Sequence, residues 1–249
     1  MINLKIAIQK SGRLNEDSLT LLKECGISIN NGKDQLMAQA SNFRLDVLYL
    51  RNSDIPQYVR DGVADIAIIG DNTEKEKKTG IRHVLDLGFS RCRLSIAVPK
   101  NVDFQDISYL QGKKIATSYP NSLKDFLTEN DIEAEIHEIS GSVEIAPNIG
   151  LADAICDLVS SGSTLFKNGL KEVYKIFESQ AILVANSGLC GEKQELLAQL
   201  VFRIKAVLAA KYNKYILLNA PEKALDRICR LLPGMKSPTI MPLRENGWV

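Results

Sequence analysis

The stretch DAICDLVSSGSTLFKNG, residues 153–169, begins as an apolar strand pattern and then becomes small, polar and hydroxylated. A turn from a strand into a helix needs only about one capping residue. Here four hydroxyl side chains and a glycine follow Val159 before the apolar pattern resumes at Leu165. The stretch therefore predicts a buried strand that ends in a ligand-binding loop, an arrangement found in α/β folds.

Strand and helix patterns alternate outward from this stretch in both directions. The sequence predicts strands at residues 4–8, 46–51, 64–69, 91–99, 114–117, 134–139, 152–159, 173–177 and 181–185. It predicts helices at 17–25 with Asn15 as the cap, 53–61 with Ser53 as the cap, 120–130, 142–149 and 192–211. This alternation is typical of βαβ units and favours an α/β class with a largely parallel sheet.

The pattern restarts near residue 90, which predicts two lobes with a central cleft. We expect residues 1–89 and 180–212 to form the first lobe and residues 90–179 to form the second. Residues 213–249 then form a smaller unit, with strands at 214–219 and 238–243, a helix at 221–232 and a further strand beginning at Trp248. So small a unit buries little apolar surface, so we expect it to be truncated or to be completed by a partner.

The composition is that of an ordinary globular protein and excludes several classes of partner. The chain has 249 residues, of which 45% are hydrophobic and 24% charged, with a formal net charge of +1. This balance gives no general attraction to nucleic acid or to an anionic membrane, and no stretch approaches membrane-spanning length. We therefore expect small-molecule substrates, no nucleic acid and no membrane among the partners.

The five cysteines form no CxxC pair, which indicates free thiols in a reducing compartment. The chain starts at Met1 without a secretory signal pattern, so a cytoplasmic location is expected. Only two histidines occur, His83 and His137, and neither lies near a cysteine pair or in a zinc-binding spacing. Zinc chemistry and a histidine-assisted nucleophile are therefore not expected.

The loop at residues 160–164 is the strongest candidate for an anion site. Backbone N–H groups that follow a parallel strand attract a phosphate group, and Gly162 lets the backbone approach it closely. Asp153 and Asp157 lie four apart on the strand and are expected to face the same side, where carboxylates suit ribose hydroxyls or Mg²⁺. The alternative interpretation is a heavily capped turn with a solvent-facing aspartate. The hydroxyl donors around the glycine are Ser160, Ser161, Ser163 and Thr164.

Other candidates follow neighbouring strands and face the same predicted cleft. Lys10 and Arg13 follow the first strand and suit a second phosphate or a pyrophosphate, although an ordinary charged loop has the same pattern. Arg51 ends another strand at the same edge. Together with the hydroxylated loop, these cations predict a ligand that carries phosphate groups on both sides of a sugar.

Two further patterns add polar groups to this cleft. Gly70 and Asp71 end the strand at 64–69 and would face the same crevice. Glu144 lies at a predicted helix start, where it orients a base or ribose in one interpretation and only complements the helix dipole in the other. The cleft thus gains acidic groups but no nucleophile.

Six stretches of the chain form a recognisable series: IAIQKSGRL (6–14), DIPQYVRDGVADIAIIG (54–70), DLGFSRCRLSIAVP (86–99), KKIATSYP (113–120), SGSVEIAP (140–147) and GLADAICDLVSSGSTLFKNGLKEV (150–173). In this order they resemble the ATP phosphoribosyltransferase family, and the resemblance extends from Leu4 to about Met241. It implies a fold similar to type II periplasmic binding proteins, with two lobes and a central cleft. The tail resembles the long form of the family, whose C-terminal regulatory domain is ferredoxin-like, and only part of that domain is expected here.

The resemblance also implies a reaction and a set of residue roles. N1 of the ATP adenine attacks the anomeric carbon of phosphoribosyl pyrophosphate (PRPP), and pyrophosphate leaves, with Mg²⁺ as the cofactor. The expected PRPP ligands are Asp153, Asp157, Ser160, Ser161, Gly162, Ser163 and Thr164. The expected catalytic residues are Lys10, Arg51 and Glu144, the last assisting loss of the adenine N6 proton. The expected ligands of ATP or pyrophosphate are Arg13, Gly70 and Asp71.

The same resemblance implies a homo-oligomer, a dimer or possibly a hexamer. The incomplete tail weakens the expectation that histidine inhibits the enzyme. Three alternatives stay open: a two-lobed binding protein without catalysis, a transferase for a different nucleotide base, and a catalytic subunit that needs a separate regulatory partner.

Overall fold

The computed structural model describes residues 2–30, 35–232, 234 and 238–249 of the chain. The chain divides into two compact units, Met1–Leu208 and Ala209–Val249. Over these described ranges, no helix is both long enough and apolar enough to cross a membrane.

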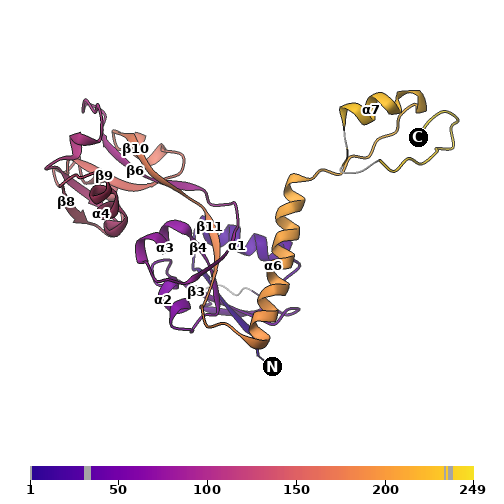
Figure 1. Ribbon diagram of the computed structural model, residues 1–249, viewed down its shortest axis with the longest axis horizontal. Helices are drawn as coiled ribbons and strands as arrows, with labels where there is room; N and C mark the ends of the chain where they lie inside the picture. Colours follow the sequence, from indigo (N-terminus) through magenta and orange to yellow (C-terminus); the bar gives the residue numbers. More distant parts are fainter. Residues whose placement is uncertain (1, 31–34, 233, 235–237) are drawn as a thin grey trace. The chain divides into compact units, whose positions relative to one another are not determined.

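The first sheet of the larger unit has six strands in the order β2-β3-β1-β4-β11-β5. Figure 1 labels three of them, β3, β4 and β11. β1 pairs in parallel with β3 and β4, while β2, β11 and β5 join by antiparallel pairing. The bounds of these strands are Leu4–Gln9 (β1), Met37–Gln39 (β2), Leu45–Leu50 (β3), Ile66–Gly70 (β4), Arg82–Asp86 (β5) and Ala181–Ala185 (β11).

Helices cover both faces of this sheet. They are α1 (Arg13–Glu24), α2 (Ile55–Arg60), α3 (Asp71–Lys77) and α6 (Gly191–Tyr212). Leu22 of α1 and Leu200 of α6 are fully buried in one core cluster with Ile6. Val59 of α2 is buried in a second cluster with Ala67. Because the central strands are covered on both sides, they are continuously apolar rather than alternating.

The second sheet has five strands in the order β10-β6-β9-β7-β8 (Figure 1). β7 pairs in parallel with β8 and β9, whereas β6 pairs antiparallel with β9 and β10. The strand bounds are Cys92–Pro99 (β6), Lys114–Thr117 (β7), Glu135–Glu138 (β8), Ala154–Val159 (β9) and Leu170–Ser179 (β10). Its helical segments are α4 (Pro120–Glu129), α5 (Ser163–Lys167) and the 3₁₀ turns η1 (Ile107–Leu110) and η2 (Val143–Ile145).

The chain crosses between the two sheets twice. β5 leads to β6 between Asp86 and Cys92, and β10 leads to β11 between Ser179 and Ala181. At the second crossing, the Ser179 hydroxyl accepts from the Asn72 N–H and donates to the Asn72 side-chain oxygen, both at 2.9 Å. The α/β class predicted from the sequence is confirmed, but both sheets are mixed rather than largely parallel, because strands at the crossings return antiparallel.

Two predicted helix caps are wrong. α1 begins at Arg13, directly after Gly12, and the Asn15 side chain instead donates to the carbonyl oxygen of Gln9 at 2.6 Å. The Ser53 hydroxyl likewise does not cap α2, because it donates to the Asp54 carboxylate at 2.8 Å. The Asn15 side chain thus binds the end of β1 and the Ser53 side chain binds its neighbour, so neither binds the free backbone N–H groups at a helix start.

The helix predicted at 142–149 is also wrong in extent. Only the 3₁₀ turn η2 forms, and turns follow it up to Gly150. Pro147 lacks the N–H group that would continue a helix, which explains the early end.

The smaller unit has a helix where the sequence predicts one, at 221–232, formed by η3 (Glu222–Ala224) and α7 (Leu225–Leu231). The strands predicted at 214–219 and 238–243 do not form in the described residues. Tyr215 is 90% exposed, and an extended segment without a backbone partner does not become a strand. The end of the chain does pair, because Ala220 and Val249 exchange backbone hydrogen bonds of 2.8 and 2.9 Å.

Candidate active site

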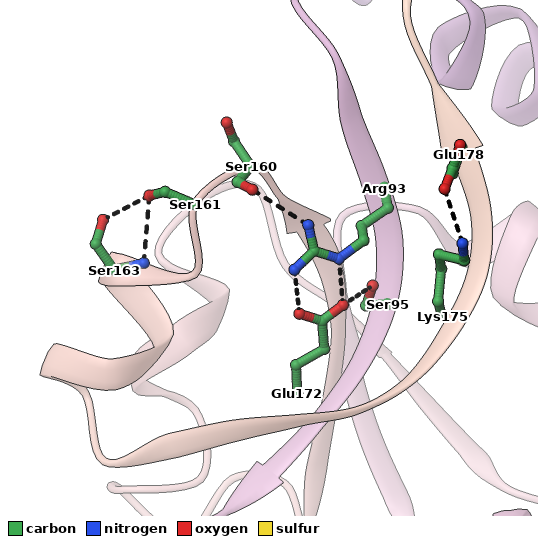
Figure 2. A network of polar contacts seen from close by, with 8 residues as sticks. All are labelled: Arg93, Ser95, Ser160, Ser161, Ser163, Glu172, Lys175 and Glu178. Carbon is green, nitrogen blue, oxygen red and sulfur yellow. Dashed lines mark hydrogen bonds and ion pairs between the residues drawn. The ribbon is translucent and has the colours of Figure 1, made fainter.

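The hydroxyl loop, Ser160–Thr164, connects the end of β9 to α5. Gly162 adopts a left-handed φ of 76°, which strains any residue with a side chain, so the turn requires glycine. The hydroxyls of Ser161 and Ser163 lie 3.0 Å apart and share a hydrogen bond (Figure 2). The loop's hydroxyl side chains are all exposed, so a ligand can reach them.

Arg93 on β6 holds the start of this loop. Its Nη1 donates to the carbonyl oxygen of Ser160 at 3.2 Å, and its guanidinium forms a two-pronged ion pair with Glu172 on β10 (Figure 2). The Ser95 hydroxyl also donates to the Glu172 carboxylate, at 2.8 Å. The hydrogen bonds from Arg93 lower the pKa of Glu172, and the Glu172 carboxylate raises the pKa of Arg93. Both groups are therefore charged at neutral pH.

Arg93 and Glu172 are site residues that the sequence pattern does not reveal. The available signal was the stretch DLGFSRCRLSIAVP, in which Arg91 and Arg93 flank a cysteine at the start of a strand. Nothing in the sequence shows that β10 lies beside this strand.

Arg13, at the start of α1, reaches the same loop. Its Nη1 donates to the Ser160 hydroxyl at 3.2 Å, and its Nη2 donates to the carbonyl oxygen of Arg91 at 3.3 Å. Lys10 and Arg51 are exposed and follow the paired ends of the parallel strands β1 and β3. The structure therefore places these three predicted cations at one edge of the first sheet and brings Arg13 to the hydroxyl loop.

Asp157 lies on β9 in a partly buried position that changes its pKa. It shares a face of the strand with Ile155, which packs in a core cluster with Val143 of η2. Burial raises the pKa of Asp157 to about 6, a shift that the Leu158 N–H opposes from 2.7 Å and that the charge of Glu144 increases. Glu144 belongs to η2, whose Val143 packs in the same core cluster as Ile155 of β9, so both predicted site carboxylates belong to segments that share this core.

Asp153 does not join this group. It precedes β9, and its carboxylate accepts a hydrogen bond from the backbone N–H of Lys114 at 2.9 Å. Asp153 and Asp157 are four residues apart, so at about 3.3 Å per residue their Cα atoms lie roughly 13 Å apart along the strand. The Asp153 carboxylate therefore binds the start of β7, and its role as a PRPP ligand stays a prediction.

Gly70 and Asp71 form the junction of β4 with α3. A side chain at Gly70 would collide with the side-chain amide of Asn72. The Asp71 carboxylate forms an ion pair with Lys75 at 2.6 Å, and its backbone N–H donates to the carbonyl oxygen of Gln180 at 2.9 Å. Asp71 therefore lies at the second crossing between the sheets, while Gly70 permits the close turn.

Two cavities have linings that come from both sheets. The first has a volume of about 660 Å³ and is lined by residues that include Asp71, Arg91, Cys92, Arg93, Ser160 and Ser179. The second has a volume of about 610 Å³ and is lined by residues that include Asn52, Thr73, Glu76, Tyr119, Glu138 and Ser140. Both volumes lie in the range of small-molecule sites.

The α3–α4 latch, formed by Glu76 and the first turn of α4, also connects the two sheets. Glu76 is only 6% exposed, and its carboxylate accepts from the backbone N–H groups of Asn121 and Ser122, each at 2.9 Å. The Ser122 hydroxyl adds a third hydrogen bond at 2.8 Å. A nearby exposed ion pair joins Lys78 to Asp125 at 2.6 Å. No local sequence pattern reveals this contact, because the partner lies 45 residues away.

Comparisons with known proteins agree with this geometry. The family model for ATP phosphoribosyltransferase matches residues 51–206, and the model for the HisG C-terminal domain matches residues 210–249. A protein of Cytophaga hutchinsonii named ATP phosphoribosyltransferase is 58% identical over 245 residues, which cover 98% of this chain and 86% of the relative.

Solved structures give the same result. The ATP phosphoribosyl transferase (HisG:HisZ) complex from Thermotoga maritima contains a similar chain, with a TM-score of 0.72 and 29% identity over 83% of this chain and 99% of that one. A substrate-binding protein of an amino acid ABC transporter has a TM-score of 0.56 at 12% identity, over 84% of this chain and 94% of that one, which shows a shared fold. The family model, the sequence relative and the Thermotoga structure agree, and the chain belongs to the ATP phosphoribosyltransferase family.

Proposed function

We propose that this chain transfers the phosphoribosyl group of PRPP to N1 of the ATP adenine and releases pyrophosphate, the first step of histidine biosynthesis. The observation that carries the proposal is the hydroxyl loop, which lies within the matched residues and is contacted by Arg13 of α1 and by Arg93 of β6. A loop with small hydroxyl donors and a required glycine suits a single phosphate monoester.

The 5′-phosphate of PRPP then binds to the hydroxyl loop. Exposed hydroxyls and backbone N–H groups of Ser160–Thr164 donate hydrogen bonds to its oxygens. Asp157, on the strand that leads to the loop, accepts hydrogen bonds from the ribose hydroxyls. A carboxylate that binds a hydroxyl pair adds charge-assisted hydrogen bonds, which are about twice as strong as neutral ones.

The pyrophosphate of PRPP and the phosphates of ATP need a separate set of cations. Lys10, Arg13 and Arg51 stand at one edge of the first sheet and suit this role. We assign Lys10 and Arg51 to the leaving pyrophosphate. Gly70 and Asp71 belong to the neighbouring strand end and contact ATP or pyrophosphate in this scheme.

The donor set near the loop fits Mg²⁺. Magnesium in enzyme sites is held by one or two carboxylates together with substrate phosphates, not by a complete protein cage. Among the described residues there is no group of three or more metal-binding side chains, but Asp157 supplies one carboxylate on the strand that leads to the hydroxyl loop. We assign Asp157 as the residue that would hold the ion together with the substrate phosphates, where the ion would neutralise the leaving pyrophosphate.

The chemistry requires positioning more than a reactive side chain. As pyrophosphate leaves, the sugar becomes oxocarbenium-like, and N1 of adenine must already lie in line with the anomeric carbon. Fixed hydrogen bonds at the 5′-phosphate and cations at the pyrophosphate stabilise the developing charges. Glu144 then assists the loss of the N6 proton after attack. No covalent intermediate with the protein is needed.

The remaining expectations follow from this assignment. We propose that residues 1–89 with 180–212 and residues 90–179 are the two catalytic lobes, and that 213–249 belong to a regulatory domain. We place the enzyme in the cytoplasm, where its free cysteines stay reduced. ATP and PRPP are the small-molecule partners, a homo-oligomer is expected, and sensitivity to histidine is left to experiment.

Pyrophosphate release by the purified chain tests this proposal. The reaction is run with PRPP, ATP and Mg²⁺, then with each omitted in turn, and then with histidine added. Release that needs all three supports the transferase. Binding of PRPP without release would instead support a two-lobed binding protein, and release with another base in place of ATP would support a different transferase.

A further inference from the structure

Strands β6, β9 and β10 place Arg93 between the hydroxyl loop and Glu172. Arg93 stands opposite Val159 in the β6–β9 register, and Val159 is the last residue of β9 before the loop. From this position Nη1 meets the Ser160 carbonyl oxygen, while Nε and Nη2 meet the Glu172 carboxylate (Figure 2). One guanidinium therefore connects the loop backbone to β10.

Strand register alone would pair Arg93 with Glu178, yet Arg93 forms its ion pair with Glu172. Arg93 stands opposite Glu178 in the β6–β10 register, whereas Glu172 stands four residues further along β6, opposite Ala97. Glu178 instead forms an ion pair with Lys175 at 2.7 Å (Figure 2). Two register shifts in β10 lie between Glu172 and Glu178, and such bulges re-aim side chains. The two bulges in β10 thus allow the Glu172 carboxylate, rather than that of Glu178, to bind Arg93.

The hydrogen bond from Arg93 fixes one peptide plane at the start of the loop. In a planar trans peptide the carbonyl and the following N–H point in opposite directions. With the Ser160 carbonyl directed at Arg93, the Ser161 N–H is turned away from Arg93. The carbonyl, which would repel a phosphate oxygen, is therefore held on the side of the guanidinium, and the opposite side presents a donor.

We propose that Arg93 and Glu172 are a positioning pair for the 5′-phosphate of PRPP, an inference that rests on the proposed function. Glu172 fixes the plane of the guanidinium through two parallel hydrogen bonds, and Arg93 fixes the Ser160–Ser161 peptide. Neither side chain touches the phosphate. Because Glu172 balances the charge of Arg93, the pair supplies orientation rather than net attraction.

Three variants test the pair: Glu172→Gln, Arg93→Lys and the double variant. For each, kcat and the KM values for PRPP and ATP are measured, together with the Kd of ribose 5-phosphate by calorimetry. Each single change is expected to raise the KM for PRPP and the Kd of ribose 5-phosphate about tenfold, with kcat and the KM for ATP within about twofold. The double variant is expected to be no worse than Arg93→Lys, because the two residues act as one unit.

A matched control is Glu135→Gln, which removes an exposed carboxylate from β8 of the same sheet. It is expected to change neither the KM for PRPP nor the Kd of ribose 5-phosphate. Unchanged binding of ribose 5-phosphate by Glu172→Gln would overturn the inference, as would equal changes in kcat and in both KM values. If the unmodified chain binds ribose 5-phosphate but shows no turnover, the proposed reaction fails while the ratio of Kd values still decides the role of the pair. If it does not bind ribose 5-phosphate, the pair has no phosphate to position and the inference is overturned.

Discussion

β7 and β9 are parallel neighbours in the second sheet, and the turns that follow them differ in whether a carboxylate of the chain is bound there. After β7, the first turn of α4 donates its backbone N–H groups to Glu76, a buried carboxylate that the chain itself supplies. After β9, the hydroxyl loop is exposed, and among the described residues no carboxylate accepts a hydrogen bond from its backbone N–H groups. The turn after β7 binds the Glu76 carboxylate and so connects the two sheets. The hydroxyl loop after β9 binds no such carboxylate in the described residues, so it can bind an anionic group of a ligand.

The largest expected effect comes from removing the internal anion. Glu76→Ala leaves two backbone donors and the Ser122 hydroxyl without partners, so it is expected to lower the free energy of unfolding by about 3 kcal/mol. For a chain of this size the melting temperature should fall by roughly 6–12 °C. Thermal unfolding with and without the substitution measures this directly.

Asp125→Asn is the matched control for this variant. It breaks the exposed ion pair with Lys78 beside the latch, and surface pairs contribute less than about 1 kcal/mol. Equal, small effects of Glu76→Ala and Asp125→Asn on the melting temperature would show that the α3–α4 latch stabilises the fold no more than an exposed ion pair does.

A smaller effect of opposite sign is expected at Asp157: its charged carboxylate destabilises the folded protein, whereas that of Glu76 stabilises it. Its pKa is raised from 3.8 to about 6 in the folded state, so the folded protein holds the proton more tightly than the unfolded chain. Stability is therefore lost as the pH rises from about 4 to about 6, and Asp157→Asn should stabilise the protein at pH 8 by about 2 kcal/mol but hardly at pH 4.

Urea unfolding across this pH range measures the difference. A stability gain that is the same at pH 4 and pH 8 would show that the charge of Asp157 is not the cause. A loss at both values would make Asp157 a structural carboxylate like Glu76, and the contrast between the two strand ends would disappear.

The smallest expected effect on stability is at Gly162. Gly162→Ala places a side chain at a φ of 76°, which costs about 1 kcal/mol. Gly80→Ala is the matched control, because Gly80 has a φ of 73° and open space around it. Both variants should lose similar stability, while only Gly162→Ala should raise the KM for PRPP, by about tenfold. Equal KM values for PRPP in the two variants would show that the hydroxyl loop does not bind PRPP.

The residue pattern predicted the β9 strand, the hydroxyl loop and the α/β class because these depend on local order in the chain. The Arg93–Glu172 pair could not be predicted in this way, because it depends on bulges that shift the β6–β10 register. The α3–α4 latch depends on a contact across 45 residues. Periodicity places Asp153 and Asp157 on one face of the strand, but it does not show that the Asp153 carboxylate binds the Lys114 backbone. The tail strands failed for a related reason, since an apolar extended pattern needs a partner to become a strand.

A crystal structure with PRPP bound is the most direct measurement of the central claim, that the strand end without an internal anion is the phosphate site. The 5′-phosphate is expected within hydrogen-bond distance of the Ser160–Thr164 backbone and hydroxyls, with Glu76 still bound to the first turn of α4. A 5′-phosphate held by Lys10 and Arg51, with the hydroxyl loop unliganded, would contradict it.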